Sequence, residues 1–326
     1  MFLLNRDIFL WDLAILVLLA FGLGLAVAAR VWLKKAGRRG LFHQILVGCI
    51  GITGFIGFVL TAYGSFIEPH LLFKTVYSVP FPMPAPLTIA VISDLHLGPY
   101  KNGRYLARAV EMSNAALPDI VILTGDYFFT SYAPSDELSP LKDLRAPLGV
   151  FAILGNHDTG RSRGLSMQGR PQQSRVEELT QAFKAMNITL LQNELTMLKT
   201  ARGDVAIAGV DDMAFGNSDA GRALNGLGPD VPVILASHSP DVILDGRSRR
   251  AQLIVAGHTH GGQIRLPFIG PIGQIPTRLG QAFDQGLFTV DDDTTLAITR
   301  GIGESGVRSR LFAWPEVMIV ETVSQN

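Results

Sequence analysis

The chain has 326 residues, 48% of them hydrophobic and 17% charged, and its 28 Lys and Arg balance 28 Asp and Glu to a formal net charge of zero. Without a basic stripe interleaved with aromatic residues in its C-terminal three quarters, it does not have the pattern of a nucleic-acid-binding protein. Cys49 is the only cysteine, which excludes an intramolecular disulfide framework.

Two long uncharged segments lie near the N-terminus. Residues 13–29 carry no charge, which is near the short limit for a bilayer span, and the apolar stretch continues past Arg30 to Leu33. Residues 40–67 are a longer uncharged stretch that can span a bilayer with room to tilt. We therefore expect residues 1–73 to form a membrane anchor with two transmembrane helices.

Glycine recurs at every third residue in the second of these segments, at Gly48, Gly51, Gly54 and Gly57. Two interpretations remain open. Small residues on one side let two membrane helices pack closely, and glycine is also simply tolerated in membrane helices.

The connection between the two segments is basic, with Arg30, Lys34, Lys35, Arg38 and Arg39. Short, positively charged loops stay in the cytoplasm. We expect a multi-pass protein of the cell (inner) membrane whose C-terminal domain is extracytoplasmic. The alternative is a signal peptide cleaved after residues 26–28, but a second apolar segment follows at once and cleavage would place the basic loop outside.

Four prolines, Pro80, Pro82, Pro84 and Pro86, favour an extended, semi-rigid spacer. We therefore predict a Pro-rich linker at residues 74–86. Residues 1–86 hold seven Lys and Arg and three Asp and Glu, which leaves 21 basic and 25 acidic residues in the rest of the chain. Residues 87–326 are long enough for the core of a single α/β domain.

Five short apolar runs in this domain have the character of buried strands: residues 87–92, 120–123, 150–154, 233–236 and 253–256. Polar side chains follow each run almost at once, and these are Asp94 and His96, Asp126, Asn156 and His157, His238, and His258 and His260. The carboxyl ends of strands are where α/β sheets place their sites, so we expect these side chains to meet.

Five of the seven histidines belong to this set, and only His43 and His70 lie outside it. Alternate residues of an extended segment point to one side, so Asp94 with His96, and His258 with His260, can each aim into one pocket. Two metal ions about 3.5–4 Å apart can share one carboxylate while a bridging hydroxide attacks phosphorus. The residue types therefore predict a two-metal site for phosphate ester chemistry.

The segments DLH, GDY, GNHD, ASHSP and GHTHGG, in this order, resemble the calcineurin-like metallophosphoesterase family, and in particular its membrane-anchored bacterial branch. The resemblance covers residues 87–323. It implies a four-layer αββα sandwich, here preceded by the two transmembrane helices, and makes residues 87–326 the catalytic domain. Periodicity alone indicates a mixed α/β domain, with helices near residues 104–115 and 176–186.

The resemblance also implies a ligand set for two divalent metal ions. The ligands of the first ion are Asp94, His96, Asp126 and His260. The ligands of the second are Asn156, His238, His258 and the bridging Asp126. Manganese, iron and zinc all suit this mixture of ligands, and the sequence does not choose among them.

In this family the equivalent of His157 contacts the phosphate and is proposed to protonate the leaving oxygen, so the resemblance implies a catalytic acid here. Asp158 either orients His157 or serves the local turn, as Asp often does. The acidic and arginine residues that some phosphatase branches carry after GDY are missing, which argues against a protein Ser/Thr phosphatase.

A second motif, GIGESG at residues 301–306, matches a dinucleotide-binding pattern, but only a short tail with one strand follows it. We interpret it as a loop near the active site, with Arg300 and Arg308 as candidate substrate contacts. Arg161, Arg163, Arg170 and Arg175 follow GNHD. They form either an anion-receiving loop or an ordinary solvated one.

These features predict a membrane-anchored metallophosphoesterase, a metal-dependent hydrolase of a lipid or cell-envelope phosphoester. Nuclease activity is disfavoured. One branch of relatives hydrolyses the pyrophosphate bond of UDP-2,3-diacylglucosamine, which is the more specific alternative, although it requires a site facing the cytoplasm. The alternative of another class is a membrane metal-binding or sensory module without catalysis, which would bind metal tightly without turnover.

Overall fold

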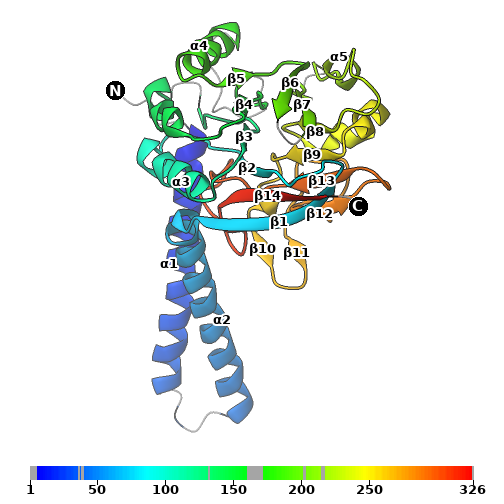
Figure 1. Cartoon of the computed structure of the whole chain (residues 1–326). Coiled ribbons are helices and arrows are strands. Elements are labelled where there is room, and N and C mark those ends of the chain that lie inside the picture. Colours follow the sequence, from blue (N-terminus) through cyan, green and yellow to red (C-terminus); the bar gives the residue numbers. More distant parts are fainter. Residues whose placement is uncertain are drawn as a thin grey trace.

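The structure is a computed structural model that describes residues 6–35, 37, 40–130, 133–159, 172–200, 203–213 and 217–324. A pair of long helices leaves one end of an α/β domain (Figure 1). The helices are α1 (Arg6–Lys35) and α2 (Leu41–Phe66), and both are long and apolar enough to cross a membrane. The C-terminal end of α1 and the N-terminal end of α2 lie at the end of the pair that is farthest from the domain.

Two of the four regularly spaced glycines in α2 lie where the two helices touch. A Cβ on Gly51 would come within 2.6 Å of Ala29 Cβ, and one on Gly54 within 2.8 Å of the Gly22 carbonyl oxygen. Gly48 and Gly57 face open space. Close packing therefore accounts for half of the glycine pattern.

The α/β domain contains two six-stranded sheets. The order of the first sheet is β1 (Phe73–Phe81), β14 (Glu316–Ser324), β2 (Thr88–Ile92), β3 (Ile120–Leu123), β4 (Val150–Ala152) and β5 (Thr189–Leu190). The order of the second is β12 (Gly286–Thr289), β13 (Thr295–Ile298), β9 (Leu253–Ala256), β8 (Val233–Ala236), β7 (Gly203–Gly209) and β6 (Glu194–Thr200). All five strands predicted ahead of the polar residues are present.

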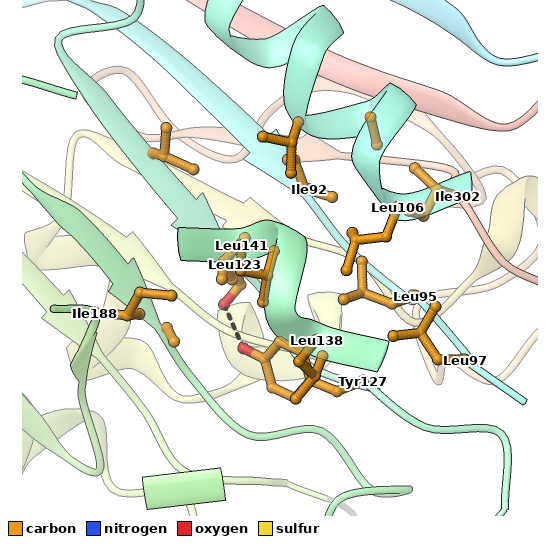
Figure 2. Packing of buried hydrophobic residues seen from close by; sticks show 14 of the residues in the cluster. Ile92, Leu95, Leu97, Leu106, Leu123, Tyr127, Leu138, Leu141, Ile188 and Ile302 are labelled. Carbon is orange, nitrogen blue, oxygen red and sulfur yellow. Dashed lines mark hydrogen bonds between the residues drawn. The ribbon is translucent and has the colours of Figure 1, made fainter. Parts of the chain in front are cut away.

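Three apolar clusters separate four layers, so the αββα sandwich is confirmed. Side chains from both sheets, such as Val91 of β2 and Val255 of β9, form the central cluster. The second cluster lies between the first sheet and the helices α3 (Gly103–Ala115) and α4 (Gln172–Ala185). Figure 2 shows part of it, with Leu106 of α3 among its members. The third lies under α5 (Ala220–Ala223) on the outer face of the second sheet.

The segment expected to be a linker is largely a strand. β1 runs parallel to β14 along its whole length, from Phe73 opposite Glu316 to Phe81 opposite Ser324. Its pairing with β14 adds a strand to the sheet, which explains the difference from a free spacer. Because β1 is an edge strand, Pro80 is tolerated there.

The end of the helix pair is joined firmly to the domain. Glu68 lies in the short helix η1 (Glu68–His70), is fully buried, and accepts the backbone N–H groups of Phe312 at 2.9 Å and Ala313 at 2.7 Å. The backbone N–H of Arg310 donates to the Gly64 carbonyl at 2.8 Å. Residues 310–313 therefore hold the domain-side end of α2.

Candidate active site

The loops that follow β2, β3, β4, β8 and β9 converge, and the structure brings the predicted site residues together. Asp94, His96, Asp126, His238 and His260 are all buried. Their ligand atoms fall into overlapping groups in which all atoms lie within 4.8 Å of one another. The prediction from strand ends therefore agrees with the observed arrangement.

The first group consists of Asp94, His96 and His260. The two imidazole Nε2 atoms are 3.2 Å apart, and Oδ1 of Asp94 is 3.4 Å from Nε2 of His260 and 3.9 Å from Nε2 of His96. Three donor atoms at such distances around one point are suited to a single divalent cation.

The second group consists of Asp126, His238 and His258. Asp126 also reaches the first group, because its Oδ2 lies 3.2 Å from Nε2 of His238 and 3.5 Å from Nε2 of His96. One carboxylate between two clusters of imidazole nitrogens is the arrangement of a bridging ligand in a two-metal site.

Asn156 supplies an oxygen on the same side. Its Oδ1 is buried and, within the described part of the chain, has no hydrogen-bond partner, as is also true of Oδ1 of Asp94. A buried polar atom without a partner is unfavourable unless something else satisfies it. Together with Asp126, His157, His258 and His260, Asn156 lines a cavity of about 300 Å³.

Hydrogen bonds behind the ligands orient their outward-facing atoms. Nδ1 of His238 lies 2.7 Å from the Thr124 carbonyl and Nδ1 of His260 lies 3.3 Å from the Gly303 carbonyl. Each contact assigns the proton to Nδ1 and leaves Nε2 free to bind a metal ion. Oδ2 of Asp94 accepts from the hydroxyl of Ser93 at 2.5 Å, so Oδ1 faces the cluster.

The backbone at the site is strained in a recurring way. Five site residues have φ between 42° and 70°, and these are Asp94, His96, Asp126, His258 and His260. Non-glycine residues seldom adopt this left-handed region, and such residues cluster at functional sites. The turn after the last ligand continues in it, since Gly261, Gly262 and Gln263 have φ of 61°, 72° and 53°.

Burial lowers the pKa of His260 to about 4 and that of His258 to about 3, the latter helped by the neighbouring His238. Both imidazoles are therefore neutral at pH 7, as metal ligands must be. Burial also opposes the charged form of His238, but the carboxylate of Asp126 outweighs it and raises the pKa of His238 to about 10.

His157 lies at the edge of the cluster and lines the cavity. Its backbone N–H donates to Oδ1 of Asp126 at 2.8 Å, and its ring centroid is 4.7 Å from that of His96, edge to face. With His96 and Asp126 it forms a third group that could hold a metal ion. Its Nδ1 is buried and makes no hydrogen bond to any described residue.

Asp158 does not orient His157. Its carboxylate accepts three backbone N–H groups, those of Asp126 at 2.7 Å, Tyr127 at 2.8 Å and Gly155 at 2.9 Å. Of the two roles left open by the sequence, the structure therefore supports the local one. Burial raises the pKa of this carboxyl to about 7, despite these donors.

The glycine-rich loop at residues 301–306 lies against the site, as expected. Gly301 has φ of 66°, and a Cβ there would come within 2.6 Å of Cβ of Asp94. The N–H of Gly303 donates to the Asp94 carbonyl at 2.7 Å. The loop therefore supports a ligand and has no role as a dinucleotide site.

The arginines proposed as substrate contacts have other partners. Arg300 pairs with Glu316 and donates to Thr75. Arg308 lies 3.9 Å from Asp12 of α1 and packs over the ring of Phe66. Arg300 is thus bonded to the first sheet and Arg308 to the anchor. These contacts do not support the expectation that the two side chains contact the substrate.

The basic segment after GNHD lies mostly outside the described residues, including Arg161, Arg163 and Arg170. Arg175 is described and is buried, with Glu178 at 3.1 Å and its guanidinium over the ring of Phe128. It is a structural residue in the present arrangement.

Sequence reasoning missed a buried charged cluster behind the site. Arg310 is fully buried and donates to the carbonyls of Gly303, Arg300 and Ala313. Glu304 lies 3.7 Å from it and 3.2 Å from Lys101. No residue pattern marks these positions, because Arg310 bonds to backbone carbonyls of its own segment, residues 300–313, and Glu304 meets Lys101 only through the fold.

Comparison with known proteins agrees with this geometry. Residues 87–262 match the family model described as calcineurin-like phosphoesterase. The chain belongs to this family and is a metal-dependent phosphoester hydrolase; the family depends on two metal ions.

Three relatives span most of the chain. The "uncharacterized metallophosphoesterase YkuE" of Bacillus subtilis is 29% identical over 306 residues, which are 90% of this chain and 100% of that protein. The UDP-2,3-diacylglucosamine pyrophosphatase LpxG of Chlamydia trachomatis is 27% identical over 83% of this chain and 97% of its own length. A Bos taurus "transmembrane protein with metallophosphoesterase domain" is 26% identical over 92% of this chain and 66% of its own length. The transmembrane relative and the two apolar helices suggest membrane association.

Proposed function

We propose that the protein is a membrane-anchored hydrolase that cleaves phosphoester bonds with two divalent metal ions, manganese, iron or zinc. The observation that carries the proposal is the position of Asp126, whose carboxylate lies within 3.5 Å of an imidazole nitrogen in each of the two ligand groups. When bound, the metal ions would neutralise phosphate oxygens and activate a water molecule.

The proposed ligands follow the two groups described above. The first ion is held by Asp94, His96, Asp126 and His260, and the second by Asp126, Asn156, His238 and His258. The unsatisfied oxygens of Asp94 and Asn156 support this assignment, because the first ion would satisfy one and the second ion the other.

We assign the role of general acid to His157. Its position on the cavity wall, next to His96, supports a contact with substrate. An imidazole can deliver a proton to the leaving oxygen near neutral pH. His157 also belongs to a third group of ligand atoms, so it could be a metal ligand instead of a proton donor. Metal content and turnover of His157→Ala separate the two roles. If His157 is the proton donor, the variant loses turnover and keeps its metal.

The proposed substrate is a phosphoester carried by a lipid or by another component of the cell envelope. The site lies close to the anchor, because Arg310 contacts Gly64 of α2 through its backbone and Gly303 of the active-site loop through its side chain. A substrate held at the membrane surface is within reach of such a site.

We propose that residues 1–73 form the anchor in the inner membrane. Residues 87–326, to whose first sheet β1 is added, form the catalytic domain outside the cytoplasm. Arg30, Lys34 and Lys35 lie in the part of α1 nearest the connection to α2, away from the domain, and this supports the orientation. A cysteine introduced at exposed Gln181 of α4, in a Cys49→Ala background, should react with an impermeant maleimide in spheroplasts. Reaction only after lysis would reverse the orientation.

The second candidate is hydrolysis of a lipid-linked pyrophosphate such as UDP-2,3-diacylglucosamine. It is favoured by the similarity to LpxG over 83% of the chain. This activity requires a cytoplasmic site, so the same labelling experiment separates the two candidates.

The test of function uses the purified full chain, stripped of metal and reloaded with manganese. An aryl phosphomonoester, an aryl phosphodiester and UDP-2,3-diacylglucosamine are compared, beside His157→Ala. Turnover of an aryl ester that falls by about 10²–10⁴-fold in the variant supports the proposal. Absence of turnover on all three substrates with metal bound would overturn it.

A further inference from the structure

An exposed hairpin follows directly on the last metal-ligand loop. It contains β10 (Arg265–Leu266) and β11 (Gly270–Pro271), which pair antiparallel. The sequence from Leu266 to Pro276 is LPFIGPIGQIP, without a single charged residue. An uncharged surface segment of this kind is unusual for a loop in contact with water.

The side chains near the tip are apolar and face solvent. Phe268 is 109% exposed, Ile269 74% and Ile272 57%. Phe268 also has φ of 67°, a conformation that bulky residues rarely adopt. Contiguous apolar groups presented in this way mark a surface that binds a partner or a membrane.

The hairpin is fixed to the segment that holds the anchor. Ile264, at its base, forms a parallel bridge with Leu311, and the N–H of Arg265 donates to the Leu311 carbonyl at 2.9 Å. The adjacent residue, Arg310, donates its N–H to Gly64 of α2. The hairpin base and the end of α2 are therefore bound to neighbouring residues of one segment.

Figure 1 shows the direction of the hairpin. It extends from the domain toward the same side as the pair formed by α1 and α2. A bilayer that surrounds the helix pair would therefore lie on the side to which the hairpin tip extends.

Partly exposed aromatic side chains mark the level at which the helix pair meets the domain. Trp314 donates its indole N–H to the hydroxyl of Tyr63 at 3.4 Å, and its ring centroid is 5.1 Å from that of Phe73. Phe66 and Phe312 are also partly exposed there. Aromatic residues gather at the interface between a membrane and water.

We propose that the hairpin tip, residues 266–273, inserts into the interfacial region of the bilayer that holds the anchor. The occupant is a lipid surface, because the tip extends to the side on which the anchor helices lie and residues 266–276 carry no charge that would pair with a protein. This inference rests on the membrane anchoring proposed above, but not on catalysis.

The insertion would bring the metal pocket to the lipid headgroups. Gln274, Ile275 and Pro276, on the return side of the hairpin, line the cavity that contains His258 and His260. The hairpin also packs on the ligand loop, since a Cβ on Gly262 would come within 2.5 Å of Pro271. One segment thus has its tip at the membrane and its return arm in the pocket wall.

The experiment measures depth in the full chain, reconstituted in vesicles of zwitterionic lipid. In a Cys49→Ala background, Phe268→Cys and Gln181→Cys are each labelled with a fluorophore. Lipids carrying a nitroxide quencher near the carbonyls or near the chain ends are then compared. Labelled native Cys49, within the apolar helix α2, reports a position inside the membrane, and Gln181, exposed on α4, reports a position in water.

We expect the label at residue 268 to be quenched about threefold or more above the label at residue 181, and most strongly by the quencher near the carbonyls. Quenching equal to that at residue 181, while Cys49 is quenched normally, would overturn the proposal. The proposal would also be overturned if the label at residue 268 were shielded from the lipid quenchers to an extent that depends on protein density. Such shielding indicates contact with a second copy of the chain. Because no activity is measured, failure of this test is distinct from failure of the proposed function.

Discussion

The carboxylate of Asp158 accepts the backbone N–H of Asp126 at 2.7 Å and that of Gly155 at 2.9 Å. It therefore joins the loop after β3, which carries the bridging ligand, to the loop after β4, which carries Asn156 and His157. Gly155 is needed at this junction, because a Cβ there would come within 2.2 Å of Oδ1 of Asp126. Asp158, which is fully buried, thus positions the bridging ligand Asp126 relative to the loop after β4.

We predict that Asp158→Asn lowers the free energy of unfolding by about 2–4 kcal/mol, because an amide cannot accept all three N–H donors and leaves buried groups unsatisfied. The measurement is thermal or denaturant unfolding of the full chain in detergent. Asp292→Asn, at an exposed turn, is the matched control. Equal stability of the two variants would contradict the positioning role.

Replacing Arg310 tests the link between the anchor and the site. Arg310→Met removes the guanidinium donors to the carbonyls of Gly303 and Ala313, and it removes one of the two positive charges beside Glu304. A loss of about 3–5 kcal/mol in unfolding free energy is expected, since one partner of a buried charged cluster is removed. Metal affinity should fall as well, because the carbonyl of Gly303 also contacts His260.

The control for this substitution is Arg308→Met. Arg308 is partly exposed and lies 3.9 Å from Asp12, so its loss should change the unfolding free energy by about 1 kcal/mol or less. An equal loss of unfolding free energy in the two variants would show that the buried contacts of Arg310 stabilise the fold no more than the partly exposed contacts of Arg308.

The charge of Lys101 predicts a pH dependence of stability. Burial lowers the pKa of Lys101 to about 8, although Glu304 at 3.2 Å favours the charged form. Between about pH 8 and 10 the unfolded chain therefore binds more protons than the folded one, and this residue makes stability rise with pH by up to about 1.4 kcal/mol per unit.

Unfolding of the wild type and of Lys101→Met should be followed over this pH range. The wild type should gain stability relative to the variant as the pH rises from 8. Parallel profiles would show that Lys101 keeps an ordinary pKa in the folded protein.

The two glycine positions in α2 allow a matched test of helix packing. Gly51→Val places a side chain against Ala29 and should separate the helices, whereas Gly48→Val enters open space. We expect the first variant alone to lower the melting temperature in detergent, by several degrees. A similar effect of both would indicate that valine itself, and not the contact, is unfavourable.

Much of the domain could be predicted because its signals are local. Uncharged segments, apolar runs of four to six residues and the polar residues that follow them indicated the two helices and the five strands that lead to the site. The pairing of β1 with β14 could not be predicted, because it joins residues near the start and the end of the chain. Four prolines in one segment favoured a spacer, and an edge strand accommodates the one at Pro80.

The ligands could be predicted because metal ligation needs imidazole and carboxylate groups, and in this chain they follow short apolar runs almost at once. The supporting residues could not. Asp158 and Arg310 act mainly through backbone groups, and Glu304 pairs with Lys101 of a distant segment. Such partners leave no spacing in the sequence. In the sequence, the hairpin at residues 266–273 is only an uncharged stretch, because nothing local determines that its apolar side chains are exposed.

The most direct test of the two-metal centre is the electron paramagnetic resonance spectrum of the full chain loaded with manganese. If Asp126 bridges two ions about 3.5–4 Å apart, the spectrum should show an exchange-coupled pair. Asp126→Asn should lose that coupling, while Asp292→Asn should keep it. A spectrum of isolated manganese ions in the fully loaded wild-type protein would contradict the account.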